Sequence, residues 1–306
     1  MKIEKPGIYY DVPTADYFGD PCAAPSLTQS IAKILLDQSP AHARLEHPRL
    51  TPAVEADEDA RAEKYDPTKA IGNAGHAMMI GRGKDIAEAE FNNFQSKEAK
   101  TFRDAPENAG KVVILTKHLR QAAAMVNAGR AALDLIKWAA AFSDGRGEVV
   151  IAWEENGFWF RSLIDWKAAA IPACYDYKST GMSIAPHGVA MMIEKAGWHV
   201  QAAMHERGLD VLEPRDAGRR KFRFLAQENY PPYAVLPVEL DEHWMTMGRK
   251  KLQHAIDIWQ RCLSLDRWPS YPLIPMTPEY PGFKEAQWLE REIAASEQPL
   301  DLLAAG

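Results

Sequence analysis

The sequence predicts a mixed α/β fold of the α+β type, in which helices flank a central sheet. Residues before 143 are patterned mostly as helices and loops, and later residues follow the order β-β-β-α-β-β-α. Such an order is typical of a layered domain whose helices cover a sheet. At 306 residues the chain can bury an ample core. We expect a single domain over 1–306, comprising a mostly helical part (1–142), a sheet core (143–240) and a C-terminal helix with a Pro-rich tail (241–306).

Caps and apolar periods define the expected helices. Ser26 or Thr28 can cap a helix that ends near Ser39-Pro40, with Ile31 and Leu35 in its apolar stripe. Further helices are expected from the glycines of 72–75 onward and over 116–142, 186–209 and 241–263. Residues 1–25 are expected to be irregular, and the acidic stretch 51–70 to be an exposed or mobile loop.

Alternating apolar residues and turn signals define the expected strands. Residues 148–153 and 158–168 are predicted to form a hairpin around Asn156-Gly157, because Asn-Gly is a strong two-residue turn signal. Three more strands are expected over 173–179, 221–228 and 233–240.

Bulk composition argues against several classes of protein. The net charge of −6 does not indicate a general nucleic-acid-binding surface. Three distant cysteines cannot form a disulfide framework or a CxxC metal cluster. We see no signal peptide, and no apolar run approaches the about 18 residues that a membrane helix needs. We therefore expect a cytoplasmic protein without a membrane partner.

Two acids and a lysine lie on strand-like segments that are otherwise apolar. Asp176 follows Asp165 by eleven residues, and Lys178 comes two residues later. Asp176 and Lys178 share one face of their strand, and pairing of the two strands would bring Asp165 beside them. Neighbouring carboxylates repel unless a cation lies between them, and oxygen ligands of this kind favour Mg²⁺. The same spacing also occurs in an ordinary hairpin with an exposed end.

Other polar residues admit two interpretations. Gln201 and His205 share a helix face with Glu194 and Trp198, which is either a solvent-exposed side or a wall above the acids. His76, in "GNAGHAMMIG", fits a core or capping role as well as a metal ligand. The basic run that contains Arg219, Arg220, Lys221 and Arg223 is either a solvated face or a DNA-contacting surface.

Together these motifs resemble the exonuclease VIII (RecE-like) family of the PD-(D/E)xK nuclease superfamily, of phage and prophage type. "GNAGHAMMIG" resembles that family's G-x-x-x-H helix, and "FWFRSLIDW" resembles the strand that ends in its first Asp. "YDYKST" resembles the D-x-K core, and "WHVQAAMH" resembles Q-A-A-x-Y with His205 in place of Tyr. The segments "GIYYDVPTADYF" and "SLTQSIAKILLDQSPAHA" resemble its opening. The resemblance covers about residues 7–240.

The resemblance implies both a site and an activity. Asp165, Asp176, Lys178 and Gln201 would be catalytic. The implied metal ligands are His76, Asp165, Asp176 and the carbonyl of Tyr177, with Glu148, Arg161 and His205 as supporting residues. Arg161 can instead form a buried pair with an acid. The basic residues Arg219, Arg220, Lys221 and Arg223 would contact DNA.

The implied activity is Mg²⁺-dependent degradation of linear double-stranded DNA from its end, in the 5′-to-3′ direction, to leave a 3′ single strand for recombination. Mn²⁺ can substitute for Mg²⁺. The implied partners are a single-strand annealing recombinase and further copies of the chain in a homo-oligomeric ring. Two alternatives stay open: a restriction-like endonuclease with the same core, and a catalytically inactive DNA-binding or assembly protein.

Overall fold

The computed structural model describes residues 1–51, 65–136, 138 and 141–297. The chain forms two compact units, Met1–Ser270 and Tyr271–Gly306. Most of the loop expected over 51–70 lies outside the described residues, and its last part is already helical, because a helix begins at Pro67. Within the described part of the chain, no helix has the length and apolar character needed to cross a membrane.

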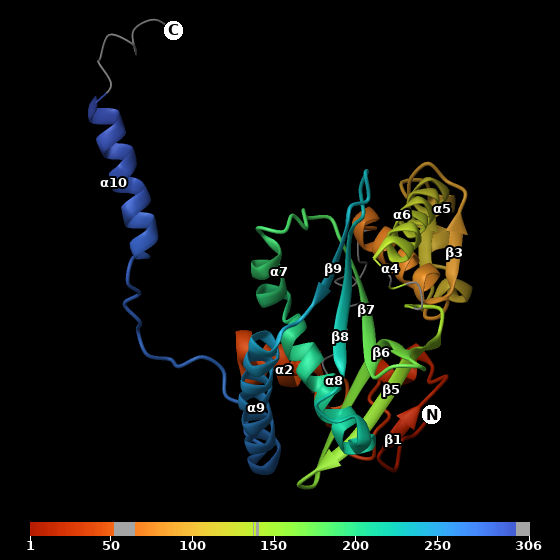
Figure 1. The fold of residues 1–306 in the computed structure, drawn as a ribbon, viewed down its shortest axis with the longest axis horizontal. Coiled ribbons are helices and arrows are strands. Elements are labelled where there is room, and N and C mark those ends of the chain that lie inside the picture. Colours follow the sequence, from red (N-terminus) through yellow and green to blue (C-terminus); the bar gives the residue numbers. More distant parts are fainter. Residues whose placement is uncertain (52–64, 137, 139–140, 298–306) are drawn as a thin grey trace, which may run out of the picture. The chain divides into compact units, whose positions relative to one another are not determined.

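A seven-stranded mixed sheet forms the centre of the first unit (Figure 1). Its order is β1-β5-β6-β7-β8-β9, with β2 paired to β6 outside this path. β7 pairs parallel with β8, and β2 with β6, whereas the other neighbours are antiparallel. The strands are β1 (Gly7–Tyr9), β2 (Ser26–Leu27), β5 (Gly145–Glu155), β6 (Phe158–Ala168), β7 (Ala173–Thr180), β8 (Lys221–Glu228) and β9 (Val235–Glu239). Strands β3 (Ile86–Ala89) and β4 (Val112–Leu115) form a separate parallel pair that the sequence did not predict.

Helices cover both faces of the sheet, which confirms the predicted fold class. The helices of the first unit are α1 (Thr14–Phe18), α2 (Gln29–Asp37), α3 (Pro40–Glu46), α4 (Pro67–Ile80), α5 (Lys97–Arg103), α6 (Thr116–Leu135), α7 (Val189–Ala196), α8 (Trp198–Leu212) and α9 (Glu242–Leu265), with short 3-10 turns at Pro106–Asn108 and Pro214–Asp216. The second unit contains α10 (Gly282–Glu297). Thr28 caps α2 by accepting from the Ile31 N–H, as predicted.

The β5–β6 hairpin follows from its turn residues. Asn156 and Gly157 have φ values of 53° and 80°. Positive φ at both central residues is what the tight hairpin turn requires, and Asn and Gly tolerate it best. The ladder closes with Glu155 opposite Phe158, so the predicted hairpin is confirmed.

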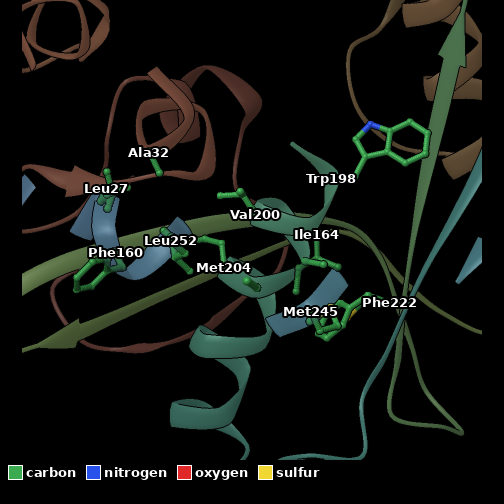
Figure 2. Close-up of a cluster of buried hydrophobic side chains, with 14 of the residues drawn as sticks. Leu27, Ala32, Phe160, Ile164, Trp198, Val200, Met204, Phe222, Met245 and Leu252 are labelled. Carbon is green, nitrogen blue, oxygen red and sulfur yellow. The ribbon is translucent and has the colours of Figure 1, made fainter. Parts of the chain in front are cut away.

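Two large hydrophobic clusters lie on opposite faces of the sheet. On one face, Val200 and Met204 of α8 and Leu252 of α9 pack with Phe160 and Ile164 of β6 (Figure 2). On the other face, α4 and α6 pack against Tyr175 and Tyr177 of β7. Cys174 belongs to the first cluster, so neighbouring residues of β7 alternate between the faces as the two-residue period predicts.

Two helix predictions and the expected irregular N-terminal segment need correction. The helix expected over 116–142 ends at Leu135, and Trp138 packs edge-on against Tyr175 instead. The helix expected over 186–209 is two helices, because Gly197 takes a left-handed φ of 76° between α7 and α8. The Pro-rich tail also contains α10, which the sequence did not predict, and the N-terminal segment expected to be irregular contains β1 and α1.

Candidate active site

The two predicted acids lie where strands β6 and β7 separate. The strands pair only at Trp166–Tyr175 and Lys167–Cys174. Asp165 and Asp176 occupy the next position of that register, at the opening of the fork. The Asp165 carboxylate accepts the Tyr177 N–H at 3.0 Å, so a side chain satisfies a backbone donor that the opened ladder leaves free. The fork therefore explains how two acids are accommodated inside a sheet.

Glu148 faces the same fork from β5. The β5–β6 register pairs Gly147 with Trp166 and Val149 with Ile164, which leaves Glu148 opposite Asp165 without a ladder pair. Glu148 has a φ of 53°. A left-handed conformation in a residue other than glycine costs about 1–3 kcal/mol and is found most often at functional sites. We infer that this backbone distortion re-aims the Glu148 side chain toward the fork.

His76 reaches the fork from α4. Its Nε2 lies 3.0 Å from Asp165 Oδ2, and its Nδ1 lies 3.9 Å from Glu148 Oε1. Gly72 precedes His76 by one helical turn and lies on the same helix face. A Cβ atom at Gly72 would lie 2.8 Å from Ser179 Oγ on β7. The glycine of the G-x-x-x-H motif therefore lets α4 approach β7 closely enough for His76 to reach Asp165.

Lys178 and Gln201 hold Asp176 from two sides. The Lys178 ammonium lies 2.7 Å from Asp176 Oδ1, and the Gln201 amide nitrogen donates to Oδ2 at 2.5 Å. Gln201 lies on α8 with Trp198 and His205, and all three are buried. The polar helix face predicted from the sequence is thus a wall of the site and not a solvent-exposed side. Glu194, expected on the same face, lies on α7 beyond the break at Gly197.

Charge at the fork is unevenly distributed. Burial and the nearby Asp165 carboxylate raise the pKa values of Asp176 and Glu148. Burial opposes protonation of His76, but the Asp165 carboxylate outweighs it and raises the pKa of His76 to about 9. Burial also opposes the ionised form of Asp165, yet His76 keeps the pKa of Asp165 below its usual value. The carboxylates of Glu148, Asp165 and Asp176 lie close together, so the fork would be stabilised by a further positive charge such as a bound cation.

The residues at the fork fit a divalent cation. Ligand atoms of His76, Glu148 and Asp165 lie within 4.8 Å of one another. Asp176 Oδ1 is buried and accepts no hydrogen bond from the described residues, although Lys178 faces it as an ion pair. Carboxylate oxygens with one imidazole suit hard or borderline cations such as Mg²⁺ and Mn²⁺. Glu148, expected only as a supporting residue, is thus a member of the convergent set.

Two shallow hollows flank Asp165, and both are partly lined by Phe18. One, of about 260 Å³, includes His76, Glu148 and Lys84. The other, of about 300 Å³, includes Lys178, Gln201 and the first residues of α2. Phe18 is 59% exposed although it ends α1 beside the acids. The sequence reasoning missed Phe18, because one aromatic residue in a segment expected to be irregular gives no pattern.

Arg161 is buried and has a structural role. Its guanidinium lies 2.8 Å from Asp20 Oδ1 and donates to the Ser26 carbonyl oxygen, and only 3% of the residue is exposed. The alternative that Arg161 forms a buried pair with an acid therefore describes the structure. Arg161 ties the N-terminal segment to β6 and is not free to contact a phosphate.

The basic run at the start of β8 is paired with acids. Arg223 and Lys221 both face Glu239, at 2.6 and 3.3 Å. Arg219 faces Asp216 at 2.5 Å, and the buried Arg220 pairs with Asp210. These carboxylates offset the positive charge that the sequence shows. DNA binding by this run stays a prediction, in which the exposed side chains of Arg219 and Lys221 are the accessible members.

Comparisons with known proteins agree with the fold. Residues 53–272 match the family described as "PDDEXK-like domain of unknown function (DUF3799)", and the chain therefore belongs to this family. A crystal structure of a candidate exonuclease from Eubacterium rectale superposes with a TM-score of 0.53 at 10% sequence identity, covering 84% of this chain and 90% of that chain. A search of curated proteins found no match. The predicted nuclease superfamily is confirmed, whereas the exonuclease VIII branch stays a prediction.

Proposed function

We propose that the protein is a metal-dependent exodeoxyribonuclease that hydrolyses phosphodiester bonds from the end of linear double-stranded DNA. The observation that carries the proposal is the meeting of Asp165, Asp176, Lys178 and His76 at the β6–β7 fork. A partly buried lysine beside convergent carboxylates is suited to the hydrolysis of an anionic ester. Glu148 completes the set of ligands that would hold a divalent cation.

The side chains of the fork have distinct tasks in this proposal. When bound, Mg²⁺ or Mn²⁺ supplies Lewis-acid polarisation of the phosphate and lowers the pKa of water. His76, Glu148 and Asp165 would hold the cation, and Asp176 would face it with Oδ1, the oxygen that is paired with Lys178. Burial opposes the charged form of Lys178, but Asp176 and Asp165 outweigh it and raise the pKa of Lys178. Before a cation binds, Lys178 is therefore an ammonium, which is suited to orienting water and to offsetting charge on the phosphate.

Action from a DNA end rests on the resemblance to exonuclease VIII and on the description of the Eubacterium rectale protein as a candidate exonuclease. The resemblance to exonuclease VIII alone implies 5′-to-3′ polarity, a 3′ single-stranded product for recombination and cytoplasmic action. A single-strand annealing protein as partner and a homo-oligomeric ring extend the proposal. Light scattering of the purified protein measures the number of copies in the assembly.

Comparison of linear with closed circular duplex DNA tests the proposal. With Mg²⁺ we expect nucleotide release from the linear form alone, and none after EDTA is added. Phosphorothioate linkages at the 5′ ends should block release, whereas the same linkages at the 3′ ends should not. Cleavage of the closed circle would instead show an endonuclease with the same site. Hydrolysis of neither form would contradict the proposed function.

A further inference from the structure

A chain of buried hydrogen bonds runs from Gln201 to the start of α2. Gln201 Nε2 lies 3.4 Å from His205 Nε2, and His205 Nδ1 lies 2.9 Å from Ser162 Oγ. The Ser162 hydroxyl donates to Gln29 Oε1 at 3.2 Å. His205 is 3% exposed and Ser162 is fully buried, so the contacts of His205 are shielded from water, whereas the contact with Gln29 is partly buried. These hydrogen bonds join β6, α8 and α2 and reach the hollow at Gln201 and Gln29.

The donor in each of these bonds follows from chemistry. The Gln201 amide nitrogen donates to Asp176 Oδ2, so its second contact, His205 Nε2, must be an acceptor. The His205 proton then lies on Nδ1 and is donated to Ser162 Oγ, whose own proton goes to Gln29 Oε1. Burial lowers the pKa of His205 to about 4, which agrees with a neutral ring. Every donor in this hydrogen-bond network therefore has an acceptor. The acceptor Gln29 Oε1 at its end determines which atom donates in each bond.

The direction of these hydrogen bonds matters because the Gln201 amide has a donor end, Nε2, and an acceptor end, Oε1. Gln201 lines the hollow that also contains Asp165 and Lys178. Its Oε1 makes no hydrogen bond to any residue in the described ranges, so this oxygen is left for water or substrate. A flipped amide would place Oε1 against the Asp176 carboxylate and leave Nε2 without its acceptor. Two acceptors around Nε2 therefore select one orientation of the amide.

We propose that Gln29, Ser162 and His205 are positioning residues that fix the Gln201 amide, with its nitrogen on Asp176 and its oxygen available to the attacking water or the phosphate. The inference rests on the proposed function for its catalytic consequence, but not for its structural content. Ser162 and His205 are buried and do not line the hollow, whereas Gln29 lines it beside Gln201 and Lys178. Gln29 acts over three successive contacts, and its half-buried position at the start of α2 makes it the residue that can be changed with least disturbance.

Steady-state DNA hydrolysis by Gln29 variants tests the relay, by which we mean the hydrogen bonds that link Gln29, Ser162, His205 and Gln201. Gln29→Met removes the acceptor at similar volume, and we expect kcat to fall about five- to tenfold with KM unchanged, which corresponds to about one hydrogen bond. Gln29→Glu keeps an acceptor at the same place and should retain the rate. Gln260→Met, at a half-buried position on α9, is the matched control and should match the wild type.

A double variant separates positioning from general support of the fold. In a Gln201→Met background no amide is left to orient, so Gln29→Met should cause no further fall in kcat. A purely structural role predicts that the two effects add and that the melting temperature falls with them. Additive effects, or a Gln29→Met enzyme with unchanged kcat, would overturn the proposal.

The ring of His205 gives a measurement that does not need activity. We expect ¹⁵N NMR of the wild-type protein at pH 7 to show His205 protonated on Nδ1 alone. In Ser162→Ala the spectrum should shift toward the other tautomer. A wild-type ring protonated on Nε2 would overturn the relay even if the protein degrades DNA. Conversely, the expected tautomer in a protein without nuclease activity would contradict only the proposed function.

Discussion

Asp20 illustrates how one buried residue secures the N-terminal segment. Burial opposes its ionisation, but His47 and Arg161 outweigh it and keep the pKa of Asp20 below its usual value. Asp20→Asn would leave Arg161 buried without its charged partner, so we expect the free energy of unfolding at pH 7 to fall by about 3–5 kcal/mol. A lowered native pKa gives stability that is present above the unfolded pKa of about 3.9 and is lost as the pH falls through the native value.

Chemical denaturation at pH 7 and at pH 3 measures this contribution. The difference between the wild type and Asp20→Asn should be large at pH 7 and smaller at pH 3. An equal difference at both pH values would show that the Asp20 charge does not stabilise the fold.

Phe18 is expected to contribute to DNA binding through its exposed ring. Its exposed ring adjoins both hollows beside Asp165, where it can stack on a nucleobase. Since one stacked base contributes about 1–3 kcal/mol, we expect Phe18→Ala to raise KM for DNA about tenfold with little change in kcat. Phe18→Trp should restore the affinity, and Phe283→Ala, on α10, serves as the control. A kcat loss without a change in KM would speak against stacking.

The residues of the site were partly predictable from the sequence. Asp176 and Lys178 share a face because strands have a period of two, and Asp165 was expected beside them. Glu148 could be suspected only as an acid on a strand, because its position depends on a left-handed backbone that no local pattern predicts. The sequence could not decide whether Arg161 supports the site or forms a buried ion pair, because its partner Asp20 lies far away along the chain.

At the scale of elements, the close crossing of α8 and α9 places Gln201. A Cβ atom at Gly248 would lie 2.1 Å from the His199 carbonyl oxygen, so glycine allows the two helices to approach. We expect Gly248→Ala to destabilise the fold by about 1–3 kcal/mol or more, and to lower kcat because α8 must shift. Gly282→Ala, which meets no atom within 4 Å, should leave both unchanged. A Gly248→Ala protein with wild-type stability and kcat would contradict this reading of the crossing.

The elements themselves were predicted where local signals are strong. Asn156-Gly157 marked the hairpin, and Asp241 caps the predicted long helix by accepting from the Trp244 N–H. The β6–β7 fork was not predictable. The two strands pair at only two positions and then separate, and this separation depends on how β8 and α8 pack around β7. The parallel β3–β4 pair was missed because its strands are short and far apart in sequence.

At the scale of the molecule, the candidate site lies within the first unit. Its hydrophobic clusters and the whole fork come from Met1–Ser270. Every side chain described from Tyr271 to Ser296 is exposed. We therefore expect a chain that ends at Ser270 to keep its melting temperature within about 2 °C, since no core is removed. It should also retain its kcat. A large fall in either would show that the second unit supports the first.

Nucleotide release from linear duplex DNA with Mg²⁺ measures directly whether the fork hydrolyses DNA. Asp165→Asn and Asp176→Asn keep the side-chain volumes and should lower the rate at least about 10²–10³-fold. Asp134→Asn, at an exposed position on α6, should match the wild type, and circular dichroism should show all four proteins folded. Wild-type rates in the two fork variants would contradict the account.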